Sequence, residues 1–296
     1  MTASIAEGQV GAVVAAMLYQ RGVVSLAEAC RLAGLPETDF IEAISVAEKA
    51  LADRQPAPDR WPRLKLPPDF KLSVLMPVYN ERRTIREIVE RVLAVDLPKE
   101  VILVDDGSTD GTRDIIRDEI EGVQDVRVIC HERNRGKGAA VRTAIAQATG
   151  TVSVIQDADL EYDPNEYPQL LAPILDGRAD VVYGSRFIGG GAHRIHLFWH
   201  YVGNKLLTTL SNMLTNLNLT DMETCYKVVR TDLLKSLPLR ANRFDIEPEL
   251  TTRLAKARAR FYEVPVSYSG RDYSEGKKIN WKDGFHALWC IWRCQF

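Results

Sequence analysis

Apolar runs alternate with amphipathic stretches along most of the chain beyond residue 70. Four runs rich in Val, Ile and Leu have the length of buried strands: 72–78, 101–106, 126–130 and 151–156. The segments that follow them repeat apolar residues at helical spacing: 84–94, 109–121, 138–148 and 164–175. This repeated strand–helix–strand order predicts an α/β fold, with a mostly parallel sheet that helices cover on both faces.

The first 53 residues predict helices without strands. The expected helices are 10–19, a segment 26–33 that Ser25 caps and Gly34 ends, and 40–51. Five prolines between residues 54 and 69 disfavour both helix and central strand. We therefore predict a small helical N-terminal module at 1–53, a proline-rich linker at 54–69 and a main domain at 70–296. The module is interpreted as a docking or oligomerisation element, so a homo-oligomer is one expected assembly.

Composition limits the class of protein. The 296 residues are 46% hydrophobic and carry a formal net charge of −2, with scattered basic residues, so no nucleic-acid partner is expected. Five cysteines without CxxC pairing favour the reducing cytoplasm. No apolar stretch approaches the roughly 20 residues of a membrane-spanning helix. Aromatic and basic residues between 281 and 296 suit either peripheral contact with the inner face of the membrane or core packing.

The most specific chemical signal lies where the fourth apolar run ends, at Asp157, Ala158, Asp159 and Glu161. Side chains two apart on a strand share a face, so Asp157 and Asp159 can point together while Ala158 leaves the backbone clear for a ligand. Carboxylates are hard ligands that suit Mg²⁺ or Mn²⁺, and Glu161 offers a third. The alternative is a solvated turn that leads into the next helix.

Polar residues also follow the first strands, and the carboxyl ends of parallel strands meet at one edge of a sheet. Tyr79 and Glu81 follow the first strand and Asp106 the second. Carboxylates there suit a ribose or a base edge, because they accept from hydroxyl and ring N–H groups but repel phosphate. Lys137, in the Gly-rich segment 134–138, can attract a diphosphate at a helix start. Neither a GxGxxG nor a Walker motif occurs, which argues against NAD(P) and ATP hydrolysis.

Six motifs in this order resemble those of family 2 glycosyltransferases with the Rossmann-like GT-A fold, in the branch of dolichyl-phosphate mannosyltransferase and bacterial polyprenyl-phosphate hexosyltransferases. They are Pro-Val-Tyr-Asn-Glu (77–81), Asp-Asp-Gly-Ser-Thr-Asp-Gly-Thr (105–112), Asn-x-Gly-Lys-Gly (134–138), Gln-Asp-Ala-Asp-Leu-Glu (156–161), Gly-Ser-Arg (184–186) and Asp-Met-Glu-Thr-Cys-Tyr-Lys (221–227). The resemblance covers about three quarters of the chain.

The resemblance implies roles for individual residues. The nucleoside would be held by Pro77, Tyr79, Glu81 and Asp106, and the rest of the nucleotide sugar by Lys137, Asp157, Ala158, Asp159 and Arg186. Asp157, Asp159 and Glu161 would hold the metal, although relatives often carry Gln at the third position. The resembling enzymes are anchored by transmembrane helices or by a membrane subunit, and this chain shows no such helices.

The second half of the chain supplies the expected acceptor side. His193 and Arg194 lie in a glycine-rich stretch that fits an acceptor loop or a plain surface loop. Arg271, Lys277 and Lys278 lie in a loop that can close over phosphates, with a solvated basic loop as the alternative. Asp221 stands where the resemblance places an acid at the acceptor. It would act as a general base toward a hydroxyl, would only orient a phosphate, or is a turn aspartate.

These patterns predict a metal-dependent, inverting transfer of a hexose from a UDP- or GDP-linked sugar to a polyprenyl or dolichyl phosphate. No covalent intermediate is needed, and no Ser or Cys stands in a triad context. Three alternatives stay open: the same chemistry on a soluble acceptor such as a peptide, natural product or glycan; a sugar-nucleotide-binding regulatory protein; and nucleotidyl transfer, which would release pyrophosphate.

Overall fold

The computed structural model describes residues 25–41, 64–189, 198–270, 289–290 and 292–294. The chain divides into two compact units, Met1–Arg60 and Trp61–Phe296. Several predictions lie outside the described residues: the helix 10–19, most of the helix 40–51, most of the linker, most of the aromatic C-terminal segment, and the side chains of His193, Arg194, Arg271, Lys277 and Lys278.

The described part of the first unit contains helix α2 (Leu26–Ala33). Ser25 and Glu28 form a capping box at its start, and Gly34 adopts the left-handed conformation, with a φ of 65°, at its end. Ala29 and Phe40 are buried together in a small apolar cluster. The helix therefore begins and ends where the sequence predicts, whereas the role of this unit stays a prediction.

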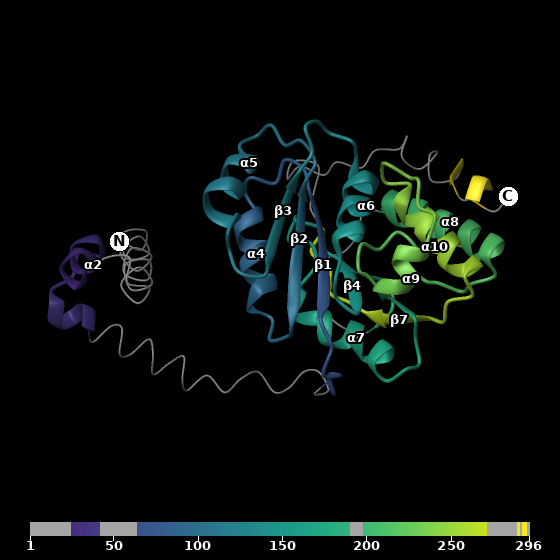
Figure 1. The fold of residues 1–296 in the computed structure, drawn as a ribbon, viewed down its shortest axis with the longest axis horizontal. Coiled ribbons are helices and arrows are strands. Elements are labelled where there is room, and N and C mark those ends of the chain that lie inside the picture. Colours follow the sequence, from purple (N-terminus) through teal and green to yellow (C-terminus); the bar gives the residue numbers. More distant parts are fainter. Residues whose placement is uncertain (1–24, 42–63, 190–197, 271–288, 291, 295–296) are drawn as a thin grey trace. The chain divides into compact units, whose positions relative to one another are not determined.

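The second unit is built on one seven-stranded sheet in the order β3-β2-β1-β4-β6-β5-β7 (Figure 1). The strands are β1 (Leu72–Val78), β2 (Lys99–Asp105), β3 (Val126–Cys130), β4 (Val152–Ile155), β5 (Val181–Ser185), β6 (Lys227–Arg230) and β7 (Phe261–Pro265). β6 is antiparallel to β4 and β5, and the other neighbours are parallel. The predicted α/β fold with a mostly parallel sheet is confirmed.

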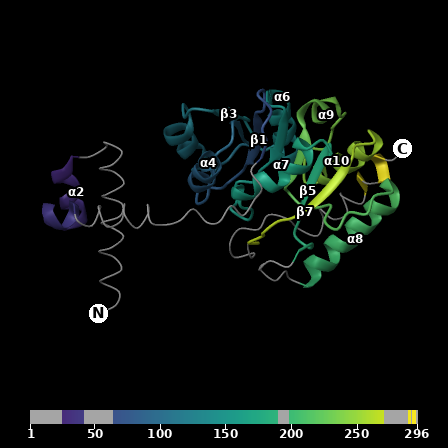
Figure 2. The same ribbon diagram turned by 90° about the horizontal axis from the view of Figure 1, so that it is seen from below.

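Helices lie against the sheet on both faces (Figures 1 and 2). The helical elements are α4 (Ile85–Ala94), α5 (Thr112–Ile115), the π-helical turn η1 (Ile116–Ile120), α6 (Lys137–Gln147), the 3₁₀ turn η2 (Pro164–Glu166), α7 (Tyr167–Leu175), α8 (Phe198–Thr215), α9 (Thr231–Ser236) and α10 (Ile246–Lys256). α6 packs on β1 and β2, and α7 packs on β5 and β7. α8 agrees with a helix expected through residues 196–216, and α9 and α10 were not predicted.

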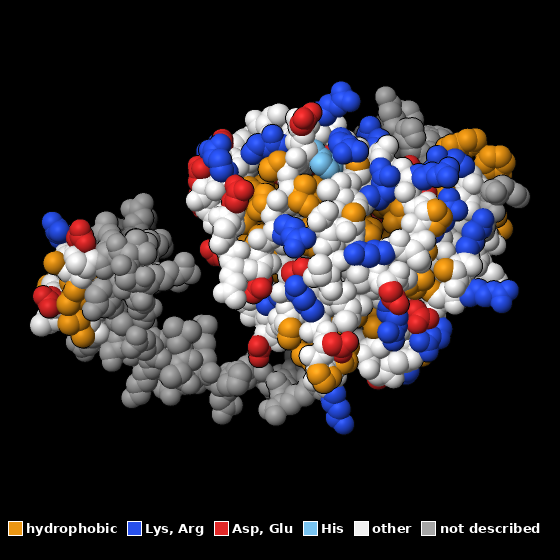
Figure 3. Space-filling model, in the orientation of Figure 1, with side chains coloured by type: hydrophobic (Ala, Val, Ile, Leu, Met, Phe, Trp, Pro, Cys, Tyr) orange, Lys and Arg blue, Asp and Glu red, His pale blue; other side chains and the backbone are white. Residues whose placement is uncertain are grey.

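Among the described residues, no helix has both the length and the apolar character needed to cross a bilayer. On the face of the second unit that carries α6, α9 and α10, Lys and Arg side chains are spread out with apolar surface between them (Figure 3). In this view they do not merge into a single basic tract.

A buried carboxylate ties the three neighbouring strands β2, β1 and β4 together at the edge where they begin. Glu100 of β2 accepts hydrogen bonds from Ser73 Oγ of β1 at 2.6 Å and from the N–H groups of Thr149 and Gly150, just before β4, at 2.6 and 3.1 Å. Burial acts to raise the pKa of Glu100, but these hydrogen bonds outweigh it and lower the pKa to about 2.

We expect Glu100→Gln to lower the free energy of unfolding by about 1–3 kcal/mol. The side-chain amide NH₂ of the glutamine would face hydroxyl and backbone N–H donors that now bind the carboxylate, which leaves buried donors unpaired. Urea denaturation at neutral pH measures the change, with Glu90→Gln on the exposed face of α4 as the matched control. Equal stability of the two variants would show that the Glu100 contacts do not hold the strands together.

Candidate functional site

The loops that follow β1 and β2 are hydrogen-bonded to each other. Asn80, with a φ of 51°, donates its N–H to Ser108 Oγ at 2.9 Å and accepts from the N–H of Thr109 at 2.8 Å. The N–H of Glu81 binds Thr112 Oγ1 at 2.9 Å. The structure therefore brings the first two predicted motifs together in one rigid edge of the sheet, with Pro77 and Tyr79 half-buried on it.

Asp106 faces the protein and anchors the Gly-rich loop. Its carboxylate accepts from the N–H groups of Arg135 and Gly136 at 2.9 and 2.7 Å and lies 2.7 Å from Nδ1 of His131. Gly136 has a φ of 95°, and a Cβ there would lie 2.3 Å from the carbonyl oxygen of Asn242, so only glycine fits. The nucleoside contact of Asp106 stays a prediction. His131 was not predicted, and its only signal is its place directly after β3.

Basic and acidic side chains alternate in a row of contacts that extends from α6 to β6. Lys137 Nζ lies 2.9 Å from Asp157 Oδ2 and 3.1 Å from Glu247 Oε1, on α10. Glu247 Oε2 lies 2.5 Å from Nζ of Lys227, which is completely buried. Burial acts to lower the pKa of Lys137, but Asp157 and Glu247 hold it well above its ordinary value. Lys137 thus neutralises the first carboxylate of the Asp-Ala-Asp motif. No motif marks Glu247 in the sequence.

The acidic segment does not continue the strand before it. β4 ends at Ile155, so strand alternation does not set the directions of Asp157 and Asp159. Asp159 Oδ1 accepts from the N–H of Glu161 at 3.2 Å, and Glu161 Oε2 accepts from the hydroxyl of Tyr268 at 2.8 Å. Ala158 is buried in the core, so its predicted contact with the donor stays a prediction.

The carboxylates of this segment fit a divalent cation that takes only some of its ligands from the protein and the others from water and a substrate. Within the described residues, no three or more His, Cys, Asp or Glu side chains are arranged as a metal site. Mg²⁺ binds through one or two carboxylates and completes its shell with waters and phosphates. Because Asp157 is already paired with Lys137, the side chains of Asp159 and Glu161 match that smaller requirement.

On the other side of the site, Asp221 and Arg186 form a bidentate ion pair. Arg186 Nε and Nη2 donate to the two carboxylate oxygens at 2.6 and 2.7 Å, and Asn204 of α8 adds a contact at 3.3 Å. Burial acts to raise the pKa of Asp221, but the guanidinium lowers it below its ordinary value. The Asp221 side chain is fully buried, whereas 12% of the Arg186 side chain is exposed. This arrangement favours an orienting role for Asp221 over a general base.

Glu223 is an acidic residue of the site that was not predicted. Its Oε1 is buried, and no residue in the described part of the chain bonds to it. Burial raises its pKa to about 7, helped by the charge of Glu247 and opposed by Lys227 and Arg186. The available signal was its place inside the 221–227 motif, two residues beyond Asp221.

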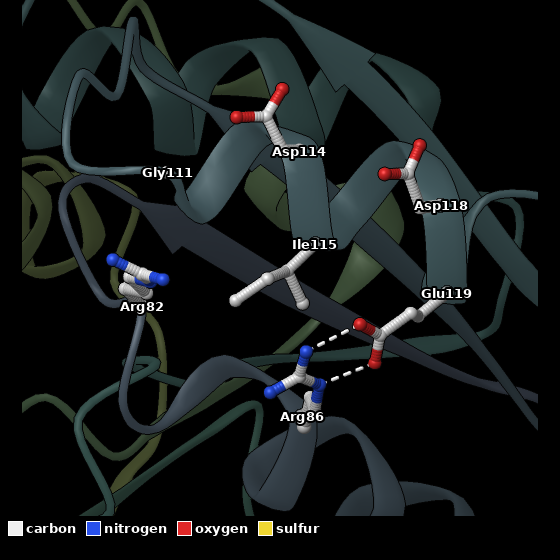
Figure 4. A pocket seen from close by; sticks show the side chains of 7 residues that line it. All are labelled: Arg82, Arg86, Gly111, Asp114, Ile115, Asp118 and Glu119. Atoms are coloured by element: carbon white, nitrogen blue, oxygen red, sulfur yellow. Dashed lines mark hydrogen bonds and ion pairs between the residues drawn. The ribbon is translucent and has the colours of Figure 1, made fainter.

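A cavity of about 330 Å³ lies near the start of α5, lined by Arg82, Arg86, Gly111, Asp114, Ile115, Asp118 and Glu119 (Figure 4). A two-contact ion pair between Arg86 and Glu119 closes one side, and Ile115 points into the space. Its charged lining offers a base little apolar surface to stack on. It contains none of the predicted site residues, and we assign it no ligand.

Comparisons with known proteins agree with these motifs. The model of the family "Glycosyl transferase family 2" matches residues 73–237, more than half of the chain. The undecaprenyl-phosphate 4-deoxy-4-formamido-L-arabinose transferase of Aeromonas hydrophila is 31% identical over 216 residues, 71% of this chain. The dolichol-phosphate mannosyltransferase of Pyrococcus furiosus is 29% identical over 233 residues, 76% of this chain. The chain covers 63% of the length of each relative.

Solved structures show the same fold. Glucosyl-3-phosphoglycerate synthase of Mycobacterium tuberculosis in complex with uridine diphosphate superposes with a TM-score of 0.59 at 21% identity, over 76% of this chain and 80% of that one. The same enzyme with Mn²⁺, uridine diphosphate and glucosyl-3-phosphoglycerate gives a TM-score of 0.56 at 22% identity, with the same coverage. At this level of identity the likeness establishes the fold.

We expect Glu223→Gln to stabilise the protein at alkaline pH. Because the folded pKa of about 7 lies above the ordinary value of 4.5, the folded state loses relative stability as pH rises through that interval. The thermal midpoint of the variant should exceed that of the wild type by about 2–4 °C at pH 8, the shift that about 1 kcal/mol produces. The gain should be smaller at pH 5. Exposed Glu132→Gln is the control, and a gain that does not change with pH would contradict the burial of a charge at Glu223.

Proposed function

The chain belongs to glycosyl transferase family 2, and we propose that it is a glycosyltransferase that transfers a hexose from a nucleoside-diphosphate sugar to a polyprenyl phosphate, with inversion and with a divalent cation. The donor is UDP- or GDP-linked. The donor side comprises the loops after β1, β2 and β4, and the acceptor side comprises Arg186 and Asp221.

The contrast between the fully buried carboxylate of Asp221 and the slightly exposed side chain of Arg186 carries this proposal. Attack by a neutral hydroxyl calls for a base that the substrate can reach. Here the carboxylate of Asp221 is fully buried and both of its oxygens accept from Arg186, whose side chain keeps 12% of its surface exposed. A guanidinium binds phosphate oxygens well, and a phosphate is already anionic when it attacks. An acceptor phosphate therefore suits this side better than an acceptor alcohol.

The relatives support the same class of acceptor. Their names contain undecaprenyl phosphate and dolichol phosphate, which are phosphates on a polyprenyl chain. Their sugars differ from each other, so they do not indicate which hexose this chain uses.

On the donor side, the Lys137 ammonium provides positive charge for the diphosphate, whereas the N–H groups of Gly138 and Ala139 at the start of α6 donate to the carbonyl oxygens of Arg243 and Asn242. A bound Mg²⁺ or Mn²⁺, held by Asp159 and Glu161 beside Asp157, would supply further positive charge to the leaving nucleoside diphosphate. Asp106 acts indirectly in this arrangement, because it fixes the loop that presents Lys137.

An apolar face on α8 supports contact with a lipid surface. Phe198, Trp199, Val202 and Leu206 are between 38% and 77% exposed on this helix. Trp289 and Trp292, near the end of the chain, are also more than half exposed. α8 carries Asn204, which contacts Asp221, so the helix with the apolar face also supports the acceptor side. We propose that this face holds the protein at the membrane surface where a polyprenyl phosphate resides.

A donor panel tests the reaction. UDP-glucose, UDP-galactose, UDP-N-acetylglucosamine and GDP-mannose are incubated with Mn²⁺ or Mg²⁺, with and without a short polyprenyl phosphate, and the release of nucleoside diphosphate is measured. We expect release that requires metal, one donor and the lipid phosphate. Release without the lipid would favour a soluble acceptor, pyrophosphate would indicate nucleotidyl transfer, and no release with any donor would favour a regulatory role.

Asp159→Asn should abolish release while the thermal midpoint stays near that of the wild type, because it removes a charged ligand from a partly exposed side chain. Asp96→Asn, at an exposed aspartate before β2, is the control and should keep full activity. Near-normal turnover of Asp159→Asn would contradict the metal role.

Leu206→Glu should weaken binding to vesicles of phosphatidylglycerol and phosphatidylcholine by about tenfold, since it removes an apolar contact and adds a repelled charge. Co-sedimentation measures the bound fraction. Val123→Glu places the same charge at another exposed aliphatic residue, in the loop before β3, and should bind as the wild type does. Equal binding of the two variants would rule out α8 as the contact surface.

A further inference from the structure

Tyr268 lies between the two halves of the proposed site, three residues beyond the end of β7. Hydrogen bonds hold the backbone on both sides of it. The N–H of Ser267 donates to the carboxylate of Glu166 at 2.9 Å, and the N–H of Ser269 donates to the carbonyl oxygen of Glu161 at 2.9 Å. The backbone that carries Tyr268 is therefore held by contacts within the protein.

The side chain of Tyr268 contacts one residue of each half. Its hydroxyl donates to Glu161 Oε2 at 2.8 Å. Its ring centroid lies 5.1 Å from the guanidinium carbon of Arg186, within the range of a cation–π contact. The ring of Tyr162 packs edge-on against it, with centroids 5.3 Å apart. Only 8% of Tyr268 is exposed, so water competes little with either contact.

The two contacts differ in chemistry and use different parts of one side chain. Burial raises the pKa of Tyr268, so its hydroxyl keeps its proton and remains a donor to the Glu161 carboxylate. The contact with Arg186 uses the π face, which a phenylalanine also provides. Arg186 is thus held on one side by Asp221 and on another by Tyr268.

We propose that Tyr268 is a positioning residue that orients Glu161 for the divalent cation through its hydroxyl and Arg186 for the acceptor phosphate through its ring. This inference rests on the proposed function. It adds that the donor and acceptor halves are aligned by one side chain from outside both sets of motifs. It also predicts that the two effects can be separated by substitution.

The test compares Tyr268→Phe, which keeps the ring, with Tyr268→Leu, which removes it. Mn²⁺ binding to the full chain is followed by the electron paramagnetic resonance signal of free Mn²⁺, alone and with UDP or GDP, and KM for a short polyprenyl phosphate is measured in parallel. We expect Tyr268→Phe to weaken Mn²⁺ binding by about tenfold, the effect of losing one charge-assisted hydrogen bond, with KM for the lipid within about twofold of the wild type. Tyr268→Leu should impair both.

The control is Tyr183→Phe, which removes a buried tyrosine hydroxyl whose partner is Thr251, at 2.8 Å, and not Glu161 or Arg186. It should change neither measurement, and thermal unfolding of all variants verifies that they fold.

Four results would overturn the inference. Wild-type Mn²⁺ affinity in Tyr268→Phe would disprove the orientation of Glu161, and a normal KM for the lipid in Tyr268→Leu would disprove that of Arg186. Equal changes of both measurements in Tyr268→Phe would indicate a general structural role. In these three cases the proposed function stands, provided that the wild type binds Mn²⁺ and turns over. A wild type that binds no Mn²⁺ with either nucleotide would contradict the proposed function together with this inference.

Discussion

The pairing of buried charges is the constraint on which the site depends. Asp157, Lys137, Glu247 and Lys227 lie in a row in which each charge meets its opposite, and Asp221 meets Arg186 in the same way. An unpaired charge at such depth costs several kcal/mol, so removal of one member destabilises its neighbours. The row links α6, α10, β6 and the end of β4, and it therefore holds the donor edge in shape before any ligand arrives. Outside this row, Glu223 Oε1 has no hydrogen-bond partner in the described part of the chain, and burial together with the charge of Glu247 raises the pKa of its carboxyl to about 7.

This pairing also determines which charges a substrate can reach. The Asp221 side chain is paired with Arg186 and fully buried, while the Arg186 side chain keeps 12% exposure. On the donor side Lys137 forms a salt bridge with Asp157. A diphosphate that binds there would therefore contact a lysine whose charge is already partly neutralised. The site therefore presents partly neutralised groups, which suits a reaction in which charge moves from the acceptor phosphate to the leaving diphosphate.

Local sequence patterns predicted the helices and strands better than they predicted the side-chain contacts. β1, β3 and α2 have the predicted bounds, because apolar runs and a capping box are properties of neighbouring residues. The motifs also located the edge of the sheet where the site lies. The directions of Asp157 and Asp159 could not be obtained in this way, because β4 ends at Ile155 and a turn follows. Glu247 and Tyr268 lie far along the chain from the residues that they contact, and only the folded topology brings them there.

The antiparallel strand β6 has a consequence for how such an enzyme can change. Since β6 runs against β4 and β5, its first residue, Lys227, lies beside their carboxyl ends, and the 221–227 motif reaches the site from the beginning of a strand. In the proposed function, the loops of the donor side lie within residues 72–161, whereas Arg186 and Asp221 of the acceptor side follow or precede the later strands β5 and β6 of the same sheet. Insertions between β5 and β6 can therefore remodel the acceptor half while the register of β1, β2 and β4 is preserved. The parts of the chain that bind the two substrates are thus free to evolve at different rates.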